Sequence, residues 1–166
     1  NSSLKSILIF VISVAILTFF DQLSKIIMVD ALKTTKTIPL IKNVLEFYYI
    51  ENTGTAWGMF GGGRIFFLVL TVIIMAVLVY ITYKKYMLMR ITIILLGSGA
   101  VGNFIDRLFL GYVRDFIYFR LINFPVFNVA DCYVTIGLAL FIIMVLFIYK
   151  DEDFNFLKPD RKGSNE

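Results

Sequence analysis

The sequence predicts a mainly α-helical integral membrane protein that crosses a bilayer four times. Of its 166 residues, 59% are hydrophobic and only 17% are charged, and the mean hydropathy is +0.83. A soluble domain is nearer half apolar and a quarter charged. The apolar excess is gathered in long uncharged runs of Ile, Leu, Val and Phe, which partition well into hydrocarbon. Composition and clustering therefore favour the same class.

Four apolar runs carry the predicted spans. Residues 65–83 and 132–149 are uncharged and nearly reach the about 20 residues that cross a bilayer core. The runs 6–20 and 91–105 become long enough only by continuing through charged residues. We expect a single domain, 1–166, with transmembrane helices at approximately 6–28, 64–84, 87–108 and 129–150.

The basic residues predict the orientation of these helices. The short connection between the second and third runs carries Lys84, Lys85 and Arg90, and short basic loops stay on the cytoplasmic side. An even number of spans puts both termini on that same side. Residues 30–63 and 108–128 then lie outside, although the first of these segments also contains basic residues.

A short strand is predicted in the first outer segment. Apolar and polar positions alternate over residues 45–49, with the period of two that is typical of a strand. The turn-forming residues 52–54 follow directly. An aromatic-rich strand and turn of this kind would suit a platform at the membrane surface.

The missing residue types exclude several kinds of chemistry. The chain has no histidine and a single cysteine, Cys132, which excludes Ser-His-Asp and Cys-His catalysis, HExxH zinc sites and an intrachain disulfide. No metal ion or cofactor is expected, so the available groups are carboxylates, Lys, Tyr, Ser and Thr. The net charge of +4 is explained by topology and does not indicate nucleic-acid binding.

Polar residues converge where the predicted helices reach the outer side. Such groups are costly at membrane depth and usually face the bundle interior or a water-filled cavity. The convergence therefore predicts a functional site. The residues on this one side, within or beside the spans, are Asp21, Lys25, Asn103, Asp106, Arg107, Asp115, Asn128 and Asp131.

Taken singly, these residues also have structural explanations. Asp21 and Lys25 are four apart and form a possible ion pair on one helix face. Asn128 and Asp131 have the spacing of a helix N-cap with an acidic third position. Asp115 could be a solvated loop carboxylate. Their convergence at one depth favours a site over several independent coincidences.

A glycine-rich segment matches a nucleotide-binding pattern without its context. Residues 97–102 (GSGAVG) fit GxGxxG, but that fingerprint needs a preceding strand and a βαβ unit. Here the segment lies inside an apolar helical run, so we expect a small-residue face for close helix packing instead.

Five segments carry a family resemblance. They are residues 21–25 (DQLSK), 52–58 (NTGTAWG), 99–107 (GAVGNFIDR), 113–116 (VRDF) and 127–131 (FNVAD). In order and spacing they resemble the signatures of the lipoprotein signal peptidases (signal peptidase II), from about residue 7 to about residue 150. Five signatures in register are far more specific than any single motif.

The resemblance implies a fold, an activity and a location. It implies four transmembrane helices with a small outer-face β-cradle and a loop that closes over the substrate, in the bacterial cytoplasmic membrane. It further implies an aspartic endopeptidase, surrounded by membrane lipid, whose active site lies at the outer face. We expect a monomer, although the sequence itself does not determine the oligomeric state. The substrate would be a prolipoprotein, cut before a diacylglyceryl-modified cysteine to remove its signal peptide.

The resemblance also implies roles for particular residues. Most family members carry Ala where this chain has Thr55, and Cys132 matches no known role. Asp115 and Asp131 would be the catalytic aspartates. The residues that would support the site and the substrate are Asp21, Lys25, Asn52, Gly54, Asn103, Arg107 and Asn128.

Two close carboxylates can supply both an acid and a base. Like charges cannot both ionise cheaply at short range, so the pair shares a proton and titrates as a unit. We hypothesise that the ionised aspartate takes a proton from water, which attacks the scissile carbonyl. Its protonated partner polarises that carbonyl and later helps the amine to leave.

Three other functions fit parts of the sequence. A proton-coupled transporter could relay protons through Asp21, Asp106 and Asp131, although transporters place such groups near the midplane and often show repeated halves. A non-catalytic membrane adaptor could use the polar cluster only to lock its helices together. A Ser24–Lys25 peptidase is geometrically poor, because neighbouring helical residues point about 100° apart.

Overall fold

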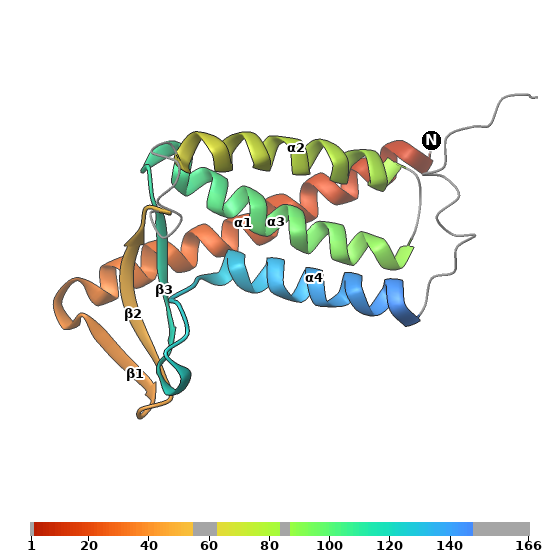
Figure 1. The fold of residues 1–166 in the computed structure, drawn as a ribbon. Coiled ribbons are helices and arrows are strands. Elements are labelled where there is room, and N and C mark those ends of the chain that lie inside the picture. The colour runs from red at the N-terminus through yellow and green to blue at the C-terminus, as the bar shows by residue number, and fades with distance from the viewer. Residues whose placement is uncertain (1, 55–62, 84–86, 148–166) are drawn as a thin grey trace, which may run out of the picture.

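The computed structural model describes residues 2–54, 63–83 and 87–147. Across these ranges, four α-helices pack side by side and a three-stranded antiparallel sheet stands at one end of the bundle (Figure 1). The elements are α1 (Ser2–Thr35), β1 (Thr37–Ile41), β2 (Leu45–Asn52), α2 (Gly63–Tyr83), α3 (Met87–Phe109), β3 (Val113–Phe119), the 3-10 helix η2 (Arg120–Ile122) and α4 (Val129–Phe147).

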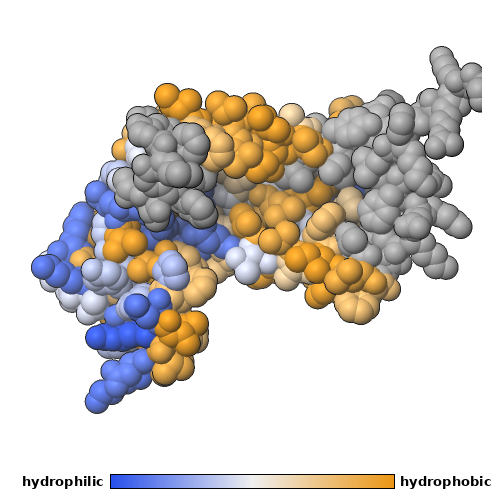
Figure 2. All heavy atoms as spheres, viewed as in Figure 1, coloured by the Kyte–Doolittle hydropathy of each residue, from blue (hydrophilic) through white to orange (hydrophobic). Residues whose placement is uncertain are grey.

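The bundle surface is apolar along its length. Among the described residues, two stretches are long and apolar enough to cross a membrane, Leu4–Thr35 and Met89–Phe109, and Val129–Met144 is a shorter apolar helix. Large side chains such as Phe19 and Phe147 point outward, with 62% and 79% of their surface exposed. Figure 2 shows hydrophobic residues over the helices and hydrophilic ones at the sheet end. So large an apolar surface suits lipid contact better than water.

The first helix is longer than the sequence predicts. We expect it to end near residue 28, yet α1 continues to Thr35. No Gly or Pro interrupts this stretch, and the helix ends where Lys36 adopts a left-handed conformation with φ 58°. The other three helices begin and end close to the predicted ranges, and residues 148–150 of the predicted last span lie outside the described residues.

The sheet joins the two segments that the sequence predicts to lie outside the membrane. The predicted strand over residues 45–49 is the first part of β2, which pairs with β1 on one side and β3 on the other. In this register Ile50 lies opposite Asp115. Phe127 exchanges backbone hydrogen bonds of 2.8 and 3.0 Å with Ile117, so β3 is tied to the segment that leads into α4.

The glycine-rich segment of α3 packs closely against its neighbours. A Cβ atom on Gly102 would stand 2.5 Å from Asp21 Oδ2, and one on Gly99 would collide with the Ala130 carbonyl oxygen. The predicted small-residue packing face is therefore confirmed, since the segment is helical and does not form a loop around a nucleotide.

Candidate active site

The first turn of α4 fixes one of the two candidate catalytic aspartates. The Asp131 N–H donates to Asn128 Oδ1 at 3.0 Å, and the Asn128 N–H donates to Asp131 Oδ2 at 3.1 Å. This reciprocal pair is a capping box built with an acidic third residue. The predicted N-cap is confirmed, and it sets the position of the Asp131 carboxylate.

Strand β3 carries the second aspartate to the same asparagine. Asp115 is 1% exposed, and its Oδ1 accepts a hydrogen bond of 2.6 Å from Asn128 Nδ2. Its Oδ2 accepts another of 2.9 Å from Asn52 Nδ2. Asn103 Nδ2 donates to Asp131 Oδ1 at 2.8 Å. One residue, Asn128, therefore contacts both carboxylates, through its side chain and through its backbone.

The surroundings of Asp115 favour its protonated form. Burial raises the pKa of Asp115 to about 6; the hydrogen bond from Asn52 opposes this rise, and the nearby Asp131 charge adds to it. Arg107 lies close enough to interact electrostatically with both Asp115 and Asp131. An acid and a base in one site need environments that separate their affinities for the proton.

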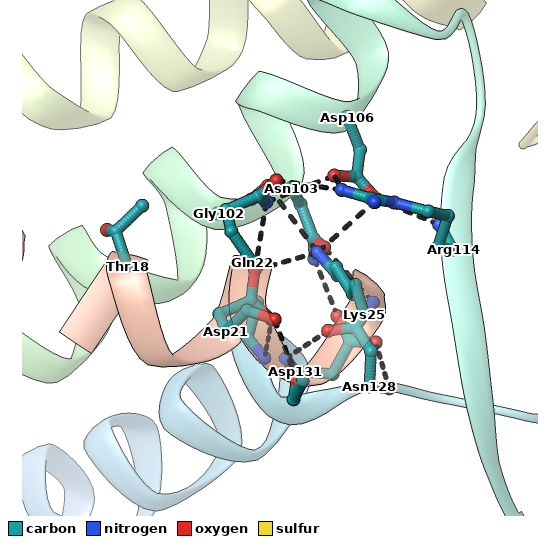
Figure 3. A network of polar contacts seen from close by, with 12 residues as sticks. Thr18, Asp21, Gln22, Lys25, Gly102, Asn103, Asp106, Arg114, Asn128 and Asp131 are labelled. Atoms are coloured by element: carbon teal, nitrogen blue, oxygen red, sulfur yellow. Dashed lines mark hydrogen bonds and ion pairs between the residues drawn. The ribbon is translucent and has the colours of Figure 1, made fainter. Parts of the chain in front are cut away.

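A buried lysine supports the site from α1. Lys25 Nζ lies 2.8 Å from Asp21 Oδ2 and 3.5 Å from Asp106 Oδ2, and all three side chains are fully buried. The same ammonium donates to Asn103 Oδ1 at 3.1 Å, and Asp21 Oδ1 accepts the Ala130 N–H at 2.9 Å (Figure 3). The predicted i,i+4 ion pair is real, and it connects α1 to α3 and to the start of α4.

Two further members of this network, Gln22 and Arg114, are not among the predicted site residues. Arg114 Nη2 lies 2.7 Å from both Asp106 Oδ1 and Gln22 Oε1, and the Arg114 N–H donates to Asp106 Oδ2 at 2.9 Å (Figure 3). Gln22 also donates to Asp106 Oδ1 at 3.0 Å. Gln22 and Arg114 each lie inside one of the five segments that carry the family resemblance, and this position could have identified them as site residues. Together they fix β3 one residue before Asp115.

Further predicted residues lie near Asp115 and Asp131, which we call the dyad. The Gly54 N–H donates to Asn52 Oδ1 at 2.9 Å, and Gly54 has φ 75°, so this turn orients the amide that contacts Asp115. Ser24 Oγ donates to the Asp21 carbonyl oxygen, which gives no support to a Ser24–Lys25 pair. Thr55 lies outside the described residues.

Known proteins resemble this chain over most of its length. The family described as "Signal peptidase (SPase) II" matches residues 13–147. The lipoprotein signal peptidase of Enterococcus faecalis is 37% identical over 154 residues, 91% of this chain and 92% of that protein. The lipoprotein signal peptidase of Halothermothrix orenii is 38% identical over 143 residues, 85% of this chain and 95% of that protein.

Solved structures agree with the sequence relatives. One chain described as a bacterial membrane enzyme matches with a TM-score of 0.77 at 36% identity, covering 84% of this chain and 94% of its own length. A second with the same description has a TM-score of 0.74 at 34% identity, with 93% of each chain covered. By sequence and by fold, the chain belongs to the signal peptidase II family.

Proposed function

We propose that this protein is a membrane aspartic endopeptidase that removes the signal peptide from prolipoproteins by cutting before a diacylglyceryl-modified cysteine. Family membership makes it a peptidase. The aspartic mechanism rests on one observation, the contact of the Asp115 and Asp131 carboxylates with the same residue, Asn128. In this proposal Asp115 and Asp131 act as the acid–base pair.

The two aspartates divide the work through their environments. Burial and the neighbouring charge keep the pKa of Asp115 high, so Asp115 is suited to hold the shared proton and polarise the scissile carbonyl. Asp131 lies in the first turn of α4, where its carboxylate accepts hydrogen bonds from the Asn128 N–H and from Asn103 Nδ2. It would take the proton from the attacking water. The asparagine amides are neutral, so they orient both carboxylates and leave the proton free to move.

The membrane setting suits a lipid-modified substrate. We expect all four helices to span the cytoplasmic membrane, with both termini in the cytoplasm, the site at the outer face, and a monomer as the working unit. An apolar cavity of about 560 Å³ lies between α1, α2 and α3, lined by residues that include Phe10, Val14, Met75 and Val101. Its size and lining would accept an acyl chain, and Gln22, which also lines it, connects it to the buried polar network.

Substitution of the two aspartates tests this proposal. Asparagine keeps their size and hydrogen-bonding capacity but cannot exchange a proton, so Asp115→Asn and Asp131→Asn should lose at least about 10³-fold in kcat while remaining folded. Cleavage of a diacylglyceryl-modified prolipoprotein would be followed by gel shift, and folding by thermal unfolding in detergent. Asp30→Asn, at an exposed carboxylate of α1, is the matched control and should cleave normally.

Three other results would redirect the assignment. Wild-type cleavage by either variant would remove that aspartate from the reaction. Loss of folding in both variants would favour the adaptor, whose polar cluster only holds helices together. An inactive wild type on well-lipidated substrate would contradict the peptidase function itself.

A further inference from the structure

An apolar patch lies at the free end of the sheet, far from the dyad along β3. It consists of Ile41 at the end of β1, Leu121 and Ile122 in η2, and Phe124 just after η2. These side chains are 55%, 65%, 65% and 50% exposed. We call these four residues the turn patch. In water, neighbouring exposed aliphatic and aromatic groups of this size are unfavourable, so a partner is expected.

Backbone hydrogen bonds fix the segment that carries most of the turn patch. The Leu121 N–H donates to the Val44 carbonyl at 3.3 Å, and the Phe124 N–H donates to the Phe119 carbonyl at 3.1 Å. Asn123, with φ 49°, closes η2 through a bond from its N–H to the Arg120 carbonyl oxygen. The backbone therefore holds these side chains outward in a defined arrangement.

The position of the patch relative to the helices indicates what covers it. In Figure 1, η2 lies at the end of the sheet away from the bundle, and along the bundle axis it is level with the ends of α2 and α3 that face the sheet. In Figure 2, hydrophobic residues at this end of the sheet lie on the side toward the helices, and hydrophilic residues lie on the side away from them. A bilayer around the apolar bundle would end at about this level.

Basic groups flank the turn patch. Lys42 is exposed next to Ile41, and the Arg120 side chain is 56% exposed while it pairs with Glu46 at 3.0 Å. Cations beside an apolar cluster favour the surface of a bilayer that contains anionic lipids, where the charges meet headgroups and the apolar groups enter the acyl boundary.

We infer that the turn patch inserts into the headgroup–acyl boundary of the bilayer and forms a second membrane contact beside the helical bundle. Interfacial elements of this kind reach about 5–10 Å into that boundary. Because η2 follows β3 without a break, this contact would hold the strand that carries Asp115 at a fixed height above the membrane. The inference depends on the bundle lying in a bilayer and does not depend on the peptidase activity.

Fluorescence quenching in vesicles tests the insertion directly. The full chain, with Cys132→Ser, would carry a bimane probe at Ile122→Cys, or at Leu121→Cys as an independent second position. Thr34→Cys is the control, since Thr34 is exposed in the last turn of α1. At the end of the bundle that carries the sheet, α1 extends farther than the other helices (Figure 1). Vesicles of phosphatidylcholine and phosphatidylglycerol would contain nitroxide-labelled lipid, and iodide would be the aqueous quencher.

The two patch probes should be quenched by the nitroxide lipid and shielded from iodide, whereas the probe at residue 34 should show the reverse. Equal iodide quenching of the patch and control probes would show that the patch lies in water and overturn the inference. Shielding from iodide without lipid quenching would also overturn it, because a protein surface, such as a second copy of this chain, would then cover the patch.

Discussion

Two carboxylate pairs lie at the same end of this molecule and are held in different ways. Asp21 and Asp106 share the Lys25 ammonium in a fully buried cluster. Asp115 and Asp131 instead accept hydrogen bonds from asparagine amides. A buried cation anchors the carboxylates that it pairs with, whereas neutral amides orient a carboxylate and allow it to exchange a proton. We therefore expect Asp21 and Asp106 to serve stability, and Asp115 and Asp131 to serve the reaction.

Removal of the shared cation should have the largest effect on stability. Lys25→Met would leave the buried Asp21 carboxylate without its cation and Asp106 with Arg114 alone, which costs about 3–5 kcal/mol of unfolding free energy. Thermal and denaturant unfolding in detergent would measure the loss. Lys33→Met is the matched control, because the Lys33–Asp30 pair on the same helix is exposed, with 66% and 79% of the side chains accessible. Exposed pairs of this kind contribute about 0–1 kcal/mol.

Equal losses in the two lysine variants would contradict the structural role of the buried cluster. A Lys25→Met protein that stays stable but no longer cleaves substrate would contradict the division into a structural pair and a catalytic pair. Lys25 would then act on the dyad through Asn103.

The stability of the protein should depend on pH through Asp115. Its folded-state pKa is about 6 against an ordinary value of 3.8, so between these values the folded state keeps a proton that the unfolded chain has released. Stability should therefore fall as pH rises from about 4 to about 6 and then level off. The amplitude is on the order of 3 kcal/mol, at 1.36 kcal/mol for each pKa unit.

Asp115→Asn isolates this contribution, because asparagine does not titrate. The stability of the variant relative to wild type should increase from pH 4 to pH 7, as measured by unfolding at each pH. A difference that stays constant over this range would show that Asp115 does not carry the raised pKa in the folded protein.

Sequence patterns predicted the parts of this fold that depend on local chemistry. Apolar runs located the four helices, and the alternation over residues 45–49 located part of β2. The spacing of Asn128 and Asp131 predicted the cap at the start of α4. Each of these features is set by neighbours in the chain, so one sequence is enough to infer it.

The features that depend on distant contacts were harder to predict. Both Asp115 and Phe116 are buried although they are adjacent in β3, so this strand lacks a simple alternation. The roles of Gln22 and Arg114 depend on their contacts with Asp106 across two helices and a strand. Family resemblance, not spacing, brought Asp115 and Asp131 together as a pair, and the structure supplies the contact that links them, Asn128.

The smallest expected effect concerns Arg114, which connects the Asp106 carboxylate to the strand that carries Asp115. Arg114 spans Asp106 and Gln22 with its planar guanidinium, a geometry that lysine cannot reproduce. Arg114→Lys should therefore shift β3 slightly and lower kcat about 10- to 100-fold, while KM for the lipidated substrate changes little. Steady-state cleavage kinetics would separate the two constants, with Arg120→Lys, at the more exposed pair with Glu46, as the control. A change in KM alone would instead assign Arg114 to substrate binding, and unchanged kinetics would show that Asn52 and Asn128 suffice to hold Asp115 in place.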